Sequence, residues 1–223
     1  MHSVYKTLII VAIVLVLAIA TAAAWFFSLH PTPTFASLPA VTRASDSHAG
    51  DPINIAFVGD EASIEKTFSA AHWLVPDPIA ASSTERIIES SVANAPYPAA
   101  PVSNLYLFGR AQDLAFELPT NTVRNRHHVR LWKTSEIISG QPLWIGTASY
   151  DAGIELSGVN YLPTHHISPN VDAERGFATQ SLSDTGLVQS VSTERNARPT
   201  AWSFNGGGDW YFDDGLVSVL MIK

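Results

Sequence analysis

The stretch that decides the fold, residues 96–132, reads PYPAAPVSNLYLFGRAQDLAFELPTNTVRNRHHVRLW. If it forms strands, its apolar residues alternate with polar ones, so that one set faces a core. The apolar set comprises Leu105, Leu107, Leu114, Phe116, Leu118, Val129 and Leu131. The set on the opposite face comprises Asp113, Glu117, His128, Arg130 and Trp132. Because neighbours on a strand point to opposite faces, His127 and His128 are predicted not to share one site.

Residues 7–29, TLIIVAIVLVLAIATAAAWFFSL, contain no charge and no proline. About 20 such residues cross the hydrocarbon core of a bilayer as a helix, which predicts one transmembrane helix over 7–29. The alternative is a cleaved signal peptide, with Lys6 as its basic region and small-residue cleavage sites within 20–24. The apolar run continues to Phe27, beyond those sites, which favours the uncleaved anchor.

The basic residues near this segment predict its orientation. Lys6 and the α-amino group precede it, and the next basic side chain is Arg43. The positive-inside bias therefore places residues 1–6 in the cytoplasm and the C-terminal domain in the periplasm. This predicts a single-pass protein of the inner (plasma) membrane, with the lipid bilayer as a partner of residues 7–29.

Beyond residue 29 the chain is acidic, with 20 Asp and Glu against 12 Lys and Arg, a formal charge of −8. A domain with this charge is a poor general binder of nucleic acid, so nucleic acid is not expected as a partner. The chain has no cysteine, which excludes disulfides, thiolate nucleophiles and cysteine-bound metals.

Residues 30–50 are rich in Pro, Ser, Thr and Ala without a helical or strand period, which is typical of a flexible linker. The folded domain is therefore predicted to span 51–223. Its helices are predicted over 61–72 after the capping residue Asp60, over 82–94, and from Asn170 or Asp172 to about Asp184. Its strands are predicted over 53–58, within 105–132, over 143–150 and over 187–193.

A turn is predicted at 151–153, and a closing hairpin is predicted between 210–212 and 216–222. Because helices and strands do not alternate strictly, the predicted fold class is α+β. We expect a mostly antiparallel or mixed sheet with about three helices packed on it, preceded by one transmembrane helix.

Several long motifs in this chain resemble those of one family. They are GDPIN (50–54), PYP (96–98), APVS (100–103), LYLFGR (105–110), QDLAFE (112–117), HHVRLW (127–132), HHI (165–167) and DAER (172–175). In this order they resemble the LssY C-terminal domain family over about 51–223. The resemblance implies an envelope-associated bacterial domain without an established activity, which in some proteins follows membrane domains similar to lipid phosphatases.

Phosphatases of that membrane type need Lys-x6-Arg-Pro followed by Pro-Ser-Gly-His. This chain has Arg198-Pro199, but Val191 stands at the lysine position and no Pro-Ser-Gly-His occurs. It also lacks a Gly-x-Ser-x-Gly elbow, and GGG (206–208) lacks the Gly-Lys-Ser/Thr ending of a phosphate loop. These reaction types are therefore not expected.

Two adjacent histidine pairs with carboxylates form the first candidate site. The candidate catalytic residues are Asp113, Glu117, His128 and His165. The candidate ligands of a divalent metal, such as zinc or manganese, are His127, His128, His165, His166 and Asp172. One histidine of each pair with one carboxylate would leave room for a water. None of the spacings is a known ligand signature, which favours structural histidines hydrogen-bonded in a polar network.

Three arginines, Arg110, Arg130 and Arg175, form the second candidate, a site for a small anionic ligand. A guanidinium pairs phosphate or carboxylate bidentately. The alternative is an ion network that specifies the fold, in which their partners are Asp113, Glu117 and Glu174.

The sequence leaves two functions open, and with them the question of whether the protein is an enzyme. The first is a membrane-anchored accessory domain that binds an envelope protein or a small anionic ligand. The second is a hydrolase that uses the histidines and carboxylates, with or without a divalent metal, on a phosphorylated or acyl envelope substrate.

Overall fold

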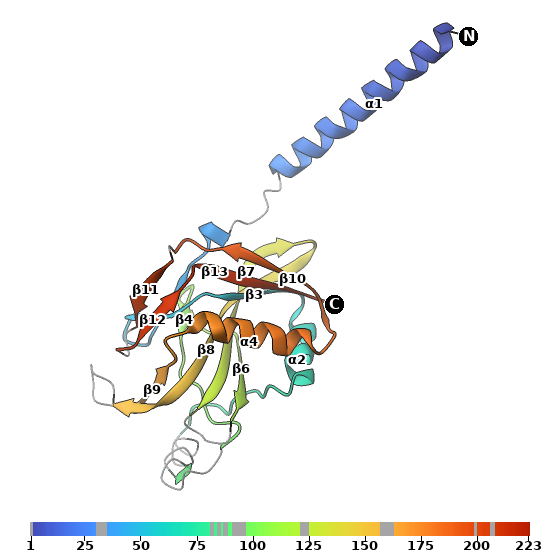
Figure 1. The fold of residues 1–223 in the computed structure, drawn as a ribbon. Helices are drawn as coiled ribbons and strands as arrows, with labels where there is room; N and C mark the ends of the chain where they lie inside the picture. Colours follow the sequence, from blue (N-terminus) through green and yellow to red (C-terminus); the bar gives the residue numbers. More distant parts are fainter. Residues whose placement is uncertain are drawn as a thin grey trace. The chain divides into compact units, whose positions relative to one another are not determined.

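The computed structural model of the protein describes residues 2–29, 35–80, 83, 86, 89–90, 97–120, 125–156, 163–198, 200–205 and 208–223. The chain forms two compact units, Met1–Thr34 and Phe35–Lys223 (Figure 1), and each is described by itself. Most of the predicted helix over 82–94 lies outside the described residues.

The first unit contains one helix, α1 (His2–Leu29). Its sequence has no proline or glycine, and its many alanines and leucines favour a helix. Described apolar side chains such as Ile9 and Trp25 are exposed. Thr21 donates its hydroxyl to backbone carbonyls one turn earlier, at 2.9 Å, so this polar group is satisfied within the helix.

The predicted transmembrane helix over 7–29 is not confirmed. Within the part of the chain that the structure describes, no helix combines the length and the apolar character that a membrane crossing requires. The membrane anchor therefore stays a prediction from the sequence.

The second unit begins at Phe35, not at the predicted Asp51. Phe35 opens a short 3-10 helix, η1 (Phe35–Ser37), and buries its ring in the core. Thr42 of β1 (Val41–Arg43) is fully buried, and its hydroxyl donates a 2.9 Å hydrogen bond to the backbone carbonyl of Asp51. Residues 35–50 thus belong to the folded domain, because a few buried side chains outweigh a composition that is typical of linkers.

A seven-stranded mixed sheet forms the centre of the second unit. Its strands are β3 (Ile55–Val58), β6 (Leu114–Pro119), β7 (Arg126–Ile138), β8 (Gln141–Leu156), β9 (Pro163–Ile167), β10 (Val188–Arg195) and β13 (Leu216–Ile222). The order is β10-β13-β3-β8-β7-β6, and β9 pairs with the far end of β8. β13 and β3 are parallel and the other neighbours are antiparallel. The predicted α+β class with a mixed sheet is confirmed.

Two smaller sheets accompany the central one. The first has the order β2-β1-β4-β5 and adds β2 (Ala49–Pro52), β4 (Tyr106–Leu107) and β5 (Arg110–Ala111). The second is the pair β11 (Ala201–Phe204) and β12 (Trp210–Asp213).

Helices α2 (Glu61–Ala70) and α4 (Val171–Ser183) pack on one face of the central sheet (Figure 1). Asp60 caps α2 as predicted, because its carboxylate accepts a 2.8 Å hydrogen bond from Ser63 N. Asn170 caps α4 by accepting from Ala173 N at 3.0 Å. The core beneath them contains Ile55, Phe57, Ile64, Phe68, Trp73, Phe116, Val129, Leu131, Trp144, Ala148, Ala178, Leu182, Leu220 and Ile222.

The opposite face of the central sheet is also covered. Its core contains Phe35, Ile53, Ala56, Val58, Leu105, Leu107, Trp132, Leu143, Ile145, Val217 and Val219. The predicted apolar face of β6 and β7 is therefore confirmed on the helix side. Leu105 and Leu107 lie instead in this second core, because β4 pairs with β1 and not with the central sheet.

Two predicted turns are wrong. The closing hairpin does not form, because β12 pairs with β11 while β13 pairs with β10 and β3. Asp214, in the predicted turn, is held instead by Arg175 of α4 at 2.7 and 2.9 Å. Residues 151–153 continue β8, and β9 supplies the pairing that makes them a strand.

Asn54 closes the point where β8 changes partner from β3 to β9. Its side-chain amide donates to the carbonyls of Ala148 and Val171, at 3.0 and 3.3 Å, and its Oδ1 accepts from Ala148 N at 2.8 Å. The side chain is fully buried. It therefore satisfies backbone groups that water does not reach.

We expect Asn54→Ala to lower the free energy of unfolding by about 3 kcal/mol or more, because buried backbone groups lose their partners. Urea unfolding of the full-length chain in detergent, followed by tryptophan fluorescence, measures this loss. Asn104→Ala, at an exposed position, is the matched control. Similar losses in both variants would contradict this role of Asn54.

Candidate functional site

Charged side chains gather on the face of the central sheet that is opposite the helices. They form a buried charge cluster, defined as Asp51, Glu117, Arg126, His128, Arg130 and Asp151. Alternation along β7 places residues 126, 128 and 130 on this face, and the pairing with β6 and β8 brings Glu117 and Asp151 beside them. None of the six residues is more than 7% exposed.

Short contacts join most of this cluster. Arg126 Nη1 donates to Glu117 Oε2 at 2.8 Å, and its Nη2 lies 3.9 Å from Asp151 Oδ2. The same Asp151 oxygen lies 2.7 Å from His128 Nε2. Arg130 Nη1 lies 3.6 Å from Asp51 Oδ2. The cluster is thus largely paired within the protein.

The segment 97–105 lies against this cluster through its backbone. Arg126 Nη1 donates to the carbonyl of Ala100 at 2.9 Å, and Arg130 Nε donates to the carbonyl of Ser103 at 3.1 Å. These bonds use guanidinium hydrogens that a bound anion would otherwise receive.

Burial controls the protonation of two members of the cluster. Desolvation raises the pKa of Glu117 to about 8, although the neighbouring Arg126 lowers it. Desolvation also lowers the pKa of His128 to about 4, although Asp151 raises it. Burial therefore favours the neutral form of both groups. Burial likewise raises the pKa of Asp51, against the opposing charge of Arg130.

His127 lies on the other face of β7, under α4. Its Nδ1 lies 3.0 and 2.9 Å from the two carboxylate oxygens of Glu174, and its ring stacks on Phe177 with centroids 4.1 Å apart. Burial raises the pKa of Glu174, and the contact with His127 lowers it. As predicted, His127 and His128 belong to different sites.

The three candidate arginines lie in three places. Arg110 binds Asp113 at 2.8 and 2.7 Å in a partly exposed pair before β6. Arg130 lies in the buried charge cluster, and Arg175 binds Asp214 from α4. Asp113 does not join the cluster. The predicted partner of Arg110 is the observed one, whereas Arg130 contacts Asp51 and not Glu117.

The other described metal candidates, His166 and Asp172, lie in different places. His166 Nδ1 pairs with Asp209, and the side chain of His165 lies outside the described part of the chain. Asp172 lies with Asp213 and Asp214, where three carboxylate oxygens are within 4.8 Å of one another. Arg175 Nη1 already contacts Asp172 at 3.0 Å, so a cation is present in this group without a metal. Burial raises the pKa of Asp172 to about 6, against the lowering effect of Arg175.

Four residues of the buried charge cluster and of the His127 site are absent from the predicted candidates. Arg126 has a signal in the sequence, because it precedes His128 and Arg130 at the two-residue spacing of one strand face. Asp151 is not a candidate because a turn is predicted at 151–153. Asp51 is not a candidate because it lies at the predicted start of the domain. Glu174 was considered only as a partner of arginine.

The opposite shifts of Glu117 and His128 predict how stability depends on pH. The raised pKa of Glu117 makes stability fall as pH rises from 4.5 to about 8, and the lowered pKa of His128 makes it fall as pH drops from 6.5 to about 4. Of these two effects, only that of Glu117 acts between pH 6.5 and 8. We expect a loss of roughly 1–2 kcal/mol across that window in the unsubstituted protein.

Glu117→Gln resembles the protonated acid, so we expect its stability to stay nearly constant between pH 6.5 and 8. Thermal unfolding of the full-length chain at a series of pH values measures this difference. Glu194→Gln, at an exposed position of β10, should retain the slope of the unsubstituted protein. If the stability of Glu117→Gln still falls between pH 6.5 and 8 as in the unsubstituted protein, the pH dependence belongs to another group.

Comparison with known proteins supports one family. A family model described as LssY C-terminus matches residues 35–217. It covers most of the second unit and includes residues 35–50, in agreement with the earlier start of the folded domain. Neither the curated proteins nor the solved structures give a significant match to the chain.

Proposed function

The chain belongs to the LssY C-terminus family, and we propose that it is a membrane-anchored accessory domain of the bacterial envelope that binds another envelope component. In this proposal residues 7–29 hold the chain in the inner membrane, with residues 1–6 in the cytoplasm and the folded domain in the periplasm. The anchor is supported by the sequence, which has 23 consecutive residues without a charge.

The observation that argues against catalysis by the candidate residues is their internal pairing. Arg110, Arg130 and Arg175 each contact a carboxylate of the domain. Arg126 and Arg130 also donate to backbone carbonyls of the segment 97–105. Groups engaged in this way specify and hold a fold, and the cost of separating a buried pair opposes their use on a ligand.

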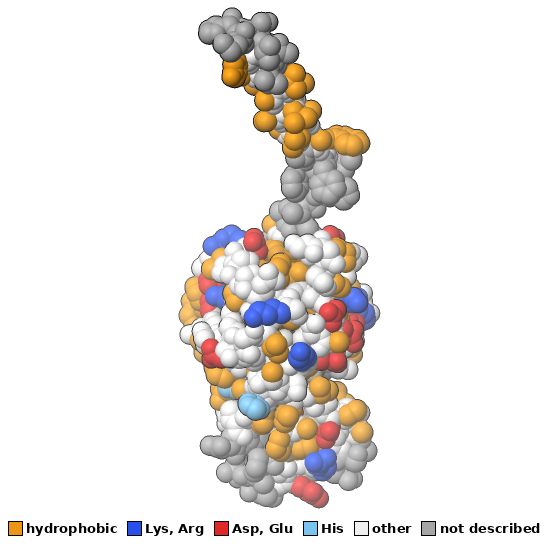
Figure 2. Space-filling view, turned by 90° about the vertical axis from the view of Figure 1, so that its right-hand side faces the viewer, with side chains coloured by type: hydrophobic (Ala, Val, Ile, Leu, Met, Phe, Trp, Pro, Cys, Tyr) orange, Lys and Arg blue, Asp and Glu red, His pale blue; other side chains and the backbone are white. Residues whose placement is uncertain are grey.

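One face of the surface agrees with this view. Figure 2 shows one side of the molecule, on which acidic and basic side chains lie interspersed. A surface of this kind does not concentrate one sign of charge, which a site for a strongly charged substrate would need.

The anchor can be tested in a Gram-negative host that expresses the full-length chain. We expect the protein to stay in the inner-membrane fraction after a carbonate wash, with its first thirty residues intact by mass spectrometry. Protease added to spheroplasts should degrade the folded domain. Ile13→Lys with Leu17→Lys should release the chain from the membrane, because each lysine costs about 3 kcal/mol at the centre of a membrane helix.

The matched control places the same two lysines at exposed apolar positions of the domain, Ile137 and Val191, where membrane retention should not change. Full-length protein in the soluble fraction would reject the anchor. A domain protected from protease in spheroplasts would reject the orientation.

A hydrolase is the second candidate function, favoured by the His127–Glu174 pair. A carboxylate that accepts from Nδ1 fixes the imidazole tautomer in which Nε2 can accept a proton from water. The His127 side chain is 18% exposed, whereas that of His128 is 1% exposed, so His127 is the more accessible of the two.

Chromogenic phosphate and acyl esters test this second function, with and without added zinc or manganese. If it is correct, the full-length chain hydrolyses one class of ester, and His127→Ala lowers the rate by about 100-fold or more. His48→Ala, at an exposed histidine, should not change it. Absence of turnover with every ester and metal would leave the accessory role.

A further inference from the structure

The β11–β12 hairpin presents four aromatic side chains on one side. Trp202 and Phe204 alternate along β11, and Trp210 and Phe212 alternate along β12. The register pairs Trp202 with Phe212 and Phe204 with Trp210, so all four share a face. We call these four residues the aromatic face.

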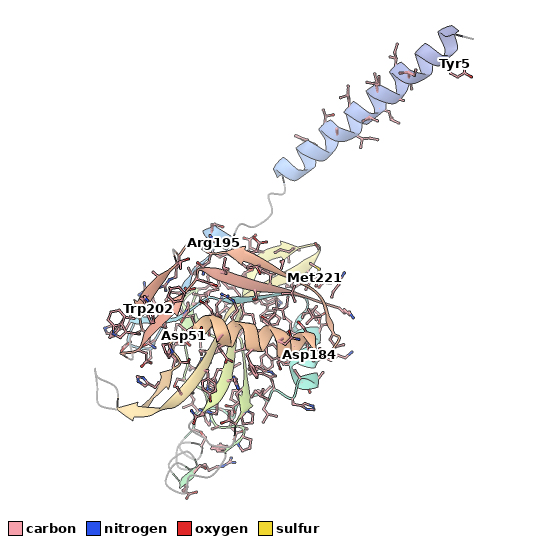
Figure 3. All side chains as sticks on the ribbon, viewed as in Figure 1. Tyr5, Asp51, Asp184, Arg195, Trp202 and Met221 are labelled. Carbon is pink, nitrogen blue, oxygen red and sulfur yellow. The ribbon has the colours of Figure 1, made fainter. Side chains whose placement is uncertain are left out.

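The aromatic face is exposed although the hairpin is firmly held. Trp202 and Trp210 are each 62% exposed and Phe204 is 52% exposed. Two pairs of rings pack against each other within the face. The ring centroids of Trp202 and Phe212 are 5.7 Å apart, and those of Phe204 and Trp210 are 5.2 Å apart. Figure 3 shows Trp202 pointing outward from the hairpin. Adjacent exposed rings of this size mark an interaction surface.

The inner side of the hairpin anchors it to the domain. Tyr211 and Asp213 are fully buried, and Arg198 reaches both, at 2.9 Å from the Tyr211 hydroxyl and 3.5 Å from Asp213 Oδ2. Phe212 N donates to the carbonyl of Pro169 at 2.8 Å. The exposed rings therefore stand on a fixed support and do not result from fraying.

The hairpin places its charges away from the aromatic face. In the described parts of residues 201–213 the charged residues are Asp209 and Asp213, and both are buried. Asp209 accepts from Ile167 N at 3.1 Å on the inner side. Aromatic rings without an exposed charged residue in the described part of the same hairpin suit the headgroup level of a bilayer, where the hydrocarbon core lies on one side and water on the other.

The hairpin directly follows, in the chain, a strand that contacts the start of the folded domain. η1, which opens the domain, contacts β10 (Figure 1), and β10 continues through residues 196–200 into β11. Residues 30–34 join Leu29 to Phe35, and in any conformation this span reaches at most roughly 20 Å. A bilayer that holds α1 therefore stays within reach of this part of the domain.

We propose that the aromatic face of β11–β12 binds the interfacial region of the lipid bilayer in which α1 is anchored. This inference rests on the proposed membrane anchor. The occupant is the zwitterionic headgroup region, because the acidic domain gains nothing from anionic lipid and the face carries rings instead of basic side chains. The contact would hold the domain against the membrane in one orientation.

The absence of cysteine allows a clean test. Single cysteines are introduced into the full-length chain by Phe204→Cys on the aromatic face, Ser69→Cys on α2 and Thr21→Cys on α1, and each is labelled with an environment-sensitive dye. The labelled chains are reconstituted in phosphatidylcholine vesicles, with or without phosphatidylglycerol. Nitroxides attached to the lipid at headgroup depth and within the acyl chains then report contact by quenching.

We expect acyl-chain nitroxide to quench the dye at position 21, headgroup nitroxide to quench the dye at 204, and neither to quench the dye at 69. Phosphatidylglycerol should not increase the quenching at 204. Adding Trp202→Ser and Trp210→Ser should abolish quenching at 204 and leave quenching at 21 unchanged. Phe108→Ser with Val191→Ser, at exposed apolar positions elsewhere, is the matched control and should change neither.

The outcomes separate this inference from the proposed function. Loss of quenching at 21 would reject the anchor itself. Quenching at 21 with none at 204 would retain the anchor and overturn the bilayer contact. A third outcome is a blue shift of the dye emission at position 204 that increases with the protein-to-lipid ratio, without quenching by the lipid nitroxides. It would assign the aromatic face to contact between copies of this chain and would also overturn the proposal.

Discussion

The structure depends on one constraint: both faces of the central sheet are covered along the middle of β7, so Arg126 and the side chains from His128 to Trp132 are buried on one side or the other. The helix side receives Val129 and Leu131, which need only apolar neighbours. The other side receives Arg126, His128 and Arg130, which need partners, because an unpaired charge in such a place costs several kcal/mol. The neighbouring strands and the segment 97–105 supply those partners.

The same burial that requires pairing also decides the protonation states. Burial favours the protonated form of Glu117 and the neutral form of His128, since removing water penalises the charged form of each. The buried charge cluster therefore carries fewer full charges than its six ionisable side chains would carry in water. This arrangement suits a rigid core better than a centre that must exchange protons with a substrate, whereas His127 beside Glu174 keeps some access to solvent.

The domain thus places its ionisable groups inward and part of its aromatic surface outward. Trp202 and Trp210 expose rings that would usually be buried, while Asp209 and Asp213 of the same hairpin face the interior. A charge distribution of this kind separates two tasks. The interior specifies the fold, and the β11–β12 hairpin leaves an apolar aromatic surface exposed.

Local pattern by itself determined the cap at Asp60 and the opposite directions of His127 and His128, because caps and strand alternation depend on a few adjacent residues. It left Asn170 and Asp172 as alternative caps of α4, and the structure has Asn170. It did not determine which strands pair across long distances. β12 pairs with β11, and Arg175 of α4 holds Asp214 at the position where a hairpin turn was predicted. Turns, domain start and charge partners were therefore decided by tertiary contacts, whose energies depend on residues far apart in the chain.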